Sequence, residues 1–158
     1  LHTNGYSLAR HILFEQEGLF VNSPVPGAGA TVGDELLKVH RSYLKPVRPL
    51  IQEGYVKGMA HITGGGFIDN IPRILPDTLG ARVEQVWPIP PIFRFLVDKG
   101  GVSLEERFRV FNMGIGMVLI IAPDKLSVVE SSLKASAEPF YLIGQVVPHE
   151  GGARIRIQ

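Results

Sequence analysis

A histidine, a threonine and three consecutive glycines lie together near the middle of the chain. His61, Thr63 and Gly64 to Gly66 follow a short apolar segment and precede an amphipathic one that a proline ends. This order predicts a strand, a glycine loop and the start of a helix. Glycine permits positive φ and lets a ligand approach the backbone N–H groups closely. If a helix begins at Gly66 or Phe67, those N–H groups would attract a phosphate.

The same loop has a second interpretation, a tight turn that binds nothing. A run of three glycines matches neither of the glycine patterns that bind nucleotide phosphates, so the pattern alone leaves both interpretations open. Asn4 is open in the same way. It lies where the N-cap of a helix is expected, and contact with a ligand is the alternative.

Other reaction classes lack the residues that they need. The chain has no cysteine, which excludes disulfides, thiolate nucleophiles and cysteine-ligated zinc. No serine lies in a nucleophile-elbow sequence, and no Walker motif occurs. The 5 histidines have no ligand-type spacing and no Asp-x-Asp cluster accompanies them, so we predict no metal site in this chain.

Composition narrows the class of protein further. With 158 residues, of which 45% are hydrophobic and 20% charged, the chain suits one globular domain with a real core. The net charge of +1 and the scattered basic residues argue against a nucleic-acid partner. No stretch approaches the roughly 18 apolar residues of a membrane span, so we expect no membrane partner and a cytoplasmic location. The chain opens without an initiator methionine, and we expect it to be a piece of a longer polypeptide.

Apolar periodicity and helix-end signals predict the elements that position the loop. Helices are expected over residues 4–17, 31–39, 46–53, 67–71, 91–98, 103–110 and 123–135, and strands over 59–62, 81–86, 115–122, 140–147 and 153–157. The apolar run 115–122 is typical of a central strand buried on both faces, and the last two strands are expected to form a hairpin. We therefore predict an α/β (α+β) fold in which helices pack on a mixed β-sheet.

Four sequence blocks occur in a fixed order along the chain: LHTNGYSL at residues 1–8, AHITGGGF at 60–67, NIPRILP at 70–76 and FNMGIGM at 111–117. Together they resemble the C-terminal domain of the aminoimidazole ribonucleotide synthetases, also called phosphoribosylformylglycinamidine cyclo-ligases. The resemblance covers essentially the whole chain. It implies that residues 1–158 form a single C-terminal domain, a sandwich like that of the synthetases, and that an N-terminal domain for ATP binding and dimerisation is absent here.

The resemblance also implies an activity. Enzymes of that family use ATP and Mg²⁺ to close the imidazole ring of aminoimidazole ribonucleotide from formylglycinamidine ribonucleotide in purine biosynthesis. The partners expected for this chain are those two ligands and its own N-terminal domain, with a homodimer formed by the full-length protein. The metal ligands would lie in the missing domain, and this domain alone is expected to be inactive.

Site residues follow from the same resemblance. His61 and Asn112 would be catalytic. The residues expected to bind the substrate and its phosphate are Asn4, Gly5, Ser7, Thr63, Gly64, Gly65, Gly66, Asn70 and Arg73. Asn70 and Arg73 have an equally sound interpretation as a helix-ending turn before Pro72 and a surface charge.

The chain departs from the family pattern in two places. Val39 and His40 stand where relatives commonly carry Pro-Thr, and Met113 stands where a cysteine is usual, which makes a catalytic thiol there unexpected.

Two alternative functions also remain open. One is a phosphate-binding or assembly module without catalysis. The other is a related ATP-using enzyme such as formylglycinamidine ribonucleotide synthetase, selenophosphate synthetase or thiamine-monophosphate kinase.

Overall fold

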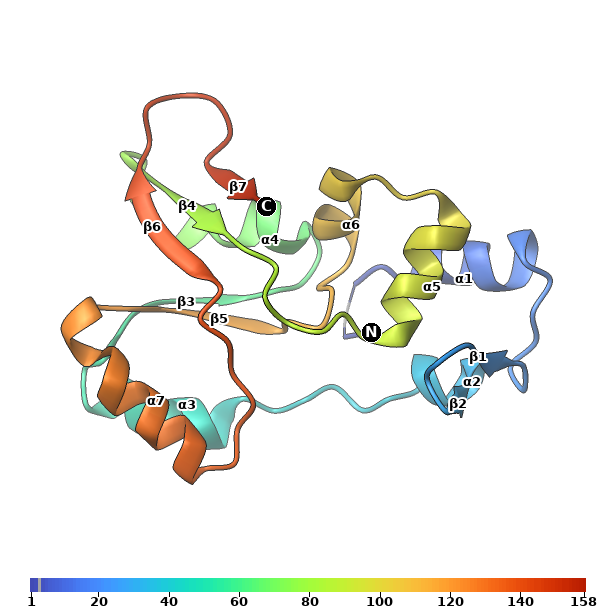
Figure 1. The fold of residues 1–158 in the computed structure, drawn as a ribbon, viewed down its shortest axis with the longest axis horizontal. Helices are drawn as coiled ribbons and strands as arrows, with labels where there is room; N and C mark the ends of the chain where they lie inside the picture. The colour runs from blue at the N-terminus through green and yellow to red at the C-terminus, as the bar shows by residue number, and fades with distance from the viewer. Residues whose placement is uncertain (3) are drawn as a thin grey trace. The chain divides into compact units, whose positions relative to one another are not determined.

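The computed structural model describes residues 1–2 and 4–158, and the chain falls into two compact units (Figure 1). Unit 1 comprises Leu1–His40, Ile62–Asn70 and Pro88–Gly116, and unit 2 comprises Arg41–His61, Ile71–Trp87 and Met117–Gln158. Each unit is therefore assembled from segments that are far apart in the sequence. No helix in the described residues is long and apolar enough to cross a membrane.

Unit 1 is mainly helical. Its elements are α1 (Tyr6–Arg10), which continues as the π-helix η1 (His11–Gln16), the strands β1 (Pro24–Val25) and β2 (Ala30–Thr31), and the helices α2 (Val32–Leu36), α4 (Gly66–Asn70), α5 (Pro91–Gly100) and α6 (Leu104–Val110). β1 and β2 form a two-stranded antiparallel sheet. The only sheet found among the described residues of this unit is thus small, and helix packing makes its core.

Side-chain caps start two of these helices as the sequence predicts. The Thr31 hydroxyl accepts a hydrogen bond from the Asp34 backbone, and the Asp34 carboxylate accepts one from the Thr31 backbone. The bond from the Thr31 hydroxyl also holds the pKa of Asp34 below its ordinary value. Ser103 caps α6 by accepting from the Glu106 backbone. Each cap satisfies an N–H group that has no partner inside its helix.

Aromatic rings form much of the core of unit 1. Phe67 of α4 meets Phe108 of α6 edge to face, with ring centroids 5.3 Å apart and planes at 84°. Phe93 of α5 lies 5.6 Å from Phe111, which follows α6. All four rings are buried. The first contact holds α6 against α4, which follows the glycines, and the second holds the residue after α6 against α5. Aromatic pairs suit this role because they combine large buried area with a preferred geometry.

Unit 2 contains two further sheets. Its elements are α3 (Leu44–Gln52), β3 (Val56–His61), the 3₁₀ helix η2 (Pro72–Ile74), β4 (Leu79–Val83), β5 (Met117–Ile121), the 3₁₀ helix η3 (Pro123–Lys125), α7 (Leu126–Ala135), β6 (Gly144–Pro148) and β7 (Ile155–Ile157). β3 pairs antiparallel with β5. β4 lies between β6, which is antiparallel to it, and β7, which is parallel. The mixed α/β class predicted from the sequence is confirmed, with small sheets in place of a single large one.

Helices α3 and α7 lie side by side in unit 2 (Figure 1). Leu50 of α3 packs with Val129 and Leu133 of α7, and apolar residues of β3 and β5 cover this cluster. Since Leu50 is 1% exposed, its side chain lies at the centre of the contact. The α3–α7 pair therefore supports the strand that leads into the glycine loop.

Three local predictions are wrong. β6 and β7 do not form a hairpin, because each pairs with a different edge of β4. β5 is not buried on both faces: only Val118 in it is buried, and β3 is its partner in a two-stranded sheet. Asn4 does not cap α1. The N-cap is Gly5, in left-handed conformation at φ 77° and without a side-chain bond.

Truncation of Leu50 tests the core of unit 2. Leu50→Ala removes a side chain that neighbours cannot replace, so the free energy of unfolding should fall by about 2–5 kcal/mol. Urea denaturation followed by circular dichroism measures this. Leu142→Ala is the matched control, since Leu142 is 61% exposed and should change stability by less than about 0.5 kcal/mol. Equal effects of the two variants would contradict the assignment of the core.

Candidate functional site

The three glycines of the loop have three different surroundings. At Gly64 a Cβ would meet nothing within 4 Å. At Gly65, where φ is +89°, a Cβ would lie 2.6 Å from the carboxylate of Asp69. At Gly66, where φ is +56°, it would lie 1.9 Å from the carbonyl oxygen of Phe108. Gly66 is therefore required for packing, Gly65 for conformation, and Gly64 faces open space.

The Asn70 side chain binds the carbonyl groups of the loop. Its side-chain nitrogen lies 2.8 Å from the carbonyl oxygen of Gly66, 3.1 Å from that of Gly64 and 3.4 Å from that of Thr63. The Gly66 N–H also donates to the Thr63 carbonyl at 2.9 Å. Asn70 is buried, and an amide NH₂ has only two hydrogens for these acceptors. Its nitrogen therefore shapes the loop. A direct bond from Asn70 to phosphate stays a prediction.

The first sequence block reaches the same part of unit 1. The Asn4 side-chain nitrogen donates to the Val110 carbonyl at 2.7 Å, at the end of α6. Gly5 lies against the next residue, since a Cβ there would be 2.5 Å from the Phe111 ring. The structure thus brings Asn4, Gly5 and the glycine loop to one short stretch of chain, residues 108–111. Ser7 lies on α1 and is exposed.

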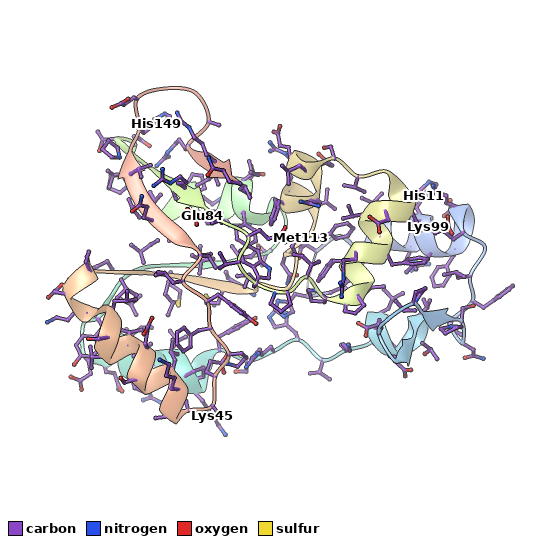
Figure 2. The ribbon with its side chains drawn as sticks, viewed as in Figure 1. His11, Lys45, Glu84, Lys99, Met113 and His149 are labelled. Atoms are coloured by element: carbon purple, nitrogen blue, oxygen red, sulfur yellow. The ribbon has the colours of Figure 1, made fainter. Side chains whose placement is uncertain are left out.

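Asn112 and Met113 form a tight turn directly after that stretch. The Asn112 side-chain oxygen accepts a hydrogen bond from the Gly114 backbone at 3.1 Å. Met113 lies in this turn (Figure 2), is 1% exposed and has φ 50°. A positive φ at a buried non-glycine residue is a strained conformation that surrounding packing must maintain. Asn112 is therefore held in place by its own turn, and its catalytic role stays a prediction.

His61 and Arg73 belong to unit 2. His61 is the exposed last residue of β3 and pairs with Met117 of β5. The Tyr43 ring meets the His61 ring at 6.3 Å between centroids, with planes at 63°. Burial raises the pKa of Tyr43, so its hydroxyl stays protonated at neutral pH. Arg73 is exposed on η2. The roles expected for both residues stay predictions.

Two charged residues beside the loop escape the sequence analysis. Asp69 of α4 forms an ion pair with Arg109 of α6, with 3.2 Å between Oδ1 and Nη1. Arg109 also pairs with Glu105 at 3.1 Å. The spacing of Glu105 and Arg109, four residues apart on one helix, indicates their pairing. The contact with Asp69 spans 40 residues, and no local pattern signals it.

The described groups around the loop suit the binding of an anion more than covalent chemistry. They are backbone amides, two asparagine side chains that hold the chain in place, and one carboxylate already paired with an arginine. No thiol is present. Amides in a fixed loop with positive φ can surround a phosphate without moving. The geometry alone therefore leaves open space beside Gly64, and the binding of a phosphate there stays a prediction.

Comparison with known proteins decides the family. The sequence pattern of the family described as "AIR synthase related protein, C-terminal domain" matches residues 1–156. The chain belongs to this family. The resemblance inferred from the four blocks is thereby confirmed, because the match covers nearly all of the chain.

Individual relatives agree with this family. A phosphoribosylformylglycinamidine cyclo-ligase of Bacillus velezensis is 49% identical over 152 residues, which are 96% of this chain and 44% of that protein. One of Shouchella clausii is 45% identical over the same shares. The chain therefore spans less than half the length of these relatives.

A solved structure supports the fold. The thiamine-monophosphate kinase of Stenotrophomonas maltophilia superimposes with a TM-score of 0.63 at 14% identity, over 99% of this chain and 48% of that one. At this identity the similarity concerns the fold alone.

Substitution of two glycines tests which of them the packing of unit 1 requires. Gly66→Ala should lower the free energy of unfolding by about 2 kcal/mol or more, because its Cβ meets a backbone carbonyl and its φ is positive. Gly64→Ala is the matched control and should leave stability within about 1 kcal/mol, since its Cβ finds open space. Chemical denaturation of both variants measures the difference. Equal stability of the two variants would mean that the backbone of α6 does not lie in close contact with Gly66.

Proposed function

We propose that this chain is the C-terminal half of a phosphoribosylformylglycinamidine cyclo-ligase and that its glycine loop binds the phosphate of the ribonucleotide substrate. The observation that carries this proposal is the identity of 45–49% over 96% of the chain with relatives of that name. The loop geometry adds support, because Gly64 leaves space for a ligand beside the backbone.

The proposed reaction asks mainly for positioning. ATP would phosphorylate the formamide oxygen of formylglycinamidine ribonucleotide, which is otherwise a poor leaving group, and ADP would be released. An amidine nitrogen of the same substrate would then attack the formyl carbon, so that a C–N bond forms, the C–O bond breaks and phosphate leaves. Because both reacting groups belong to one molecule, holding it in the right conformation lowers much of the barrier. This chain would fix the substrate through its phosphate, and we propose catalytic roles for His61 and for Asn112.

The residues gathered in unit 1 do not fit a magnesium site. Mg²⁺ takes carboxylate, carbonyl and water oxygens in an octahedral arrangement. The carboxylate beside the loop, Asp69, is already paired with Arg109. The side-chain nitrogens of Asn4 and Asn70 are hydrogen-bond donors and offer a cation no ligand atom. We therefore assign no metal-dependent step to these residues. ATP and Mg²⁺ would be held mainly by the N-terminal part that the relatives possess, and that part would also form the dimer.

The rival from another class is a phosphate-binding module without catalysis. The same loop geometry supports it, since binding needs no partner domain. Turnover distinguishes the two functions. This chain alone should not convert formylglycinamidine ribonucleotide with ATP and Mg²⁺, and the chain joined to the N-terminal portion of the Bacillus velezensis relative should. The measurement is the release of ADP together with formation of aminoimidazole ribonucleotide. A folded joined protein without turnover that still binds phosphate would favour the module.

His61→Ala in the joined protein tests the catalytic assignment. If the imidazole transfers a proton or stabilises charge at the reacting atoms, kcat should fall by roughly 10²-fold or more. His149→Ala is the matched control because His149, which is partly buried, also belongs to unit 2 and has no expected role. Steady-state kinetics measures both variants. Unchanged kcat in a folded His61→Ala protein would return this residue to a structural role.

A further inference from the structure

A negatively charged side chain, that of Asp69 in α4, lies beside the proposed phosphate loop. The Asp69 carboxylate lies so close to Gly65 that a Cβ on the glycine would come within 2.6 Å of Oδ2. The Asp69 backbone N–H donates to the Gly65 carbonyl at 3.0 Å, which fixes this residue beside the loop. A carboxylate at such a position repels any phosphate that approaches the same backbone.

Arg109 meets this carboxylate from another helix. Its guanidinium reaches Asp69 through Nη1 at 3.2 Å and Glu105 through Nη2 at 3.1 Å. The backbone of α6 presses on Gly66, since a Cβ there would lie 2.9 Å from the Arg109 carbonyl oxygen. The backbone contact therefore sets the distance between the arginine and the loop.

Stability does not explain the pair. The side chain of Arg109 is 39% exposed and that of Asp69 is 42% exposed, and ion pairs of such exposure contribute little to folding. Their electrostatic effect on a bound anion is larger. At about 6 Å and an effective dielectric constant of about 40, an unpaired carboxylate would lower the affinity for a singly charged anion about tenfold.

We propose that Arg109 is a positioning residue that neutralises Asp69 and holds its carboxylate against α6, so that the loop amides can bind a phosphomonoester. This inference rests on the proposed function of the loop. In it Arg109 acts through Asp69 and does not itself touch the phosphate. The two residues therefore act as a unit, and a double-mutant cycle reveals that coupling.

The experiment titrates this chain with inorganic phosphate and follows the backbone amide signals of Gly64 and Gly65 by NMR at low ionic strength. Arg109→Met should weaken binding about tenfold, because it exposes the Asp69 charge. Asp69→Asn with Arg109→Met should restore the affinity to within about threefold of wild type. The loss in Arg109→Met should also shrink in 0.5 M salt, which screens exposed charges beyond about 4 Å.

Three further variants serve as controls. Arg109→Lys keeps the charge and should keep most of the affinity, which also covers the case that Arg109→Met folds poorly. Arg94→Met removes an exposed arginine of α5 in the same unit and should leave binding unchanged. Gly64→Val places a side chain in the open position of the loop and should abolish the shifts.

The outcomes separate the inference from the proposed function. If wild type gives no shifts at the loop, or Gly64→Val binds as well as wild type, the loop is not the phosphate site and both fail. If wild type binds and the double variant is as weak as Arg109→Met, Arg109 contacts the phosphate directly and only the inference fails. Wild-type affinity in Arg109→Met would overturn it as well. Recovery in the double variant, with Arg94→Met unaffected, supports it.

Discussion

The contact between the backbone of Gly66 and the end of α6 is the constraint on which the rest of unit 1 depends. The carbonyl group of Phe108 occupies the space that a Cβ on Gly66 would need. Glycine is the residue type that permits both this approach and the positive φ found there. The same end of α6 accepts the Asn4 hydrogen bond two residues further along, at the Val110 carbonyl. One helix end thus joins two sequence blocks that lie 60 residues apart.

Hydrogen bonds from two buried asparagines hold this junction together. Asn4 binds the end of α6, and Asn70 binds the carbonyl groups of the glycine loop. Asn4 is 8% exposed and Asn70 is 6% exposed. A buried amide that loses its partner costs about 1–3 kcal/mol, so these bonds are strongly favoured once the chain is folded. The asparagines of the site therefore form its frame, and the loop backbone is what remains to meet a ligand.

Sequence reasoning succeeded where the signal is local. The caps at Thr31 and Ser103 depend on residues three positions apart. The start of α5 at Pro91 depends on a single proline, whose ring fixes a helical φ. It failed where partners are distant. Whether β6 and β7 pair with each other or with β4 is decided by packing that spans 75 residues, as in the Arg154 bonds to the β4 region. Asn4 was misjudged for the same reason, since its partner lies 106 residues away. The pattern alone supplied the glycine loop as a possible phosphate site, and the other site residues and their roles came from the resemblance.

The loop also shows why a glycine run is a weak signal for a ligand when taken alone. The surroundings explain Gly65 and Gly66 in different ways, and they give no structural explanation for the open one, Gly64. A tight turn would account for Gly65 and Gly66, whose φ values are positive. It does not account for Gly64, whose position would accommodate a side chain without contact. The interpretation as a tight turn therefore explains two glycines of three, and Gly64 is the position at which the backbone is open to a ligand.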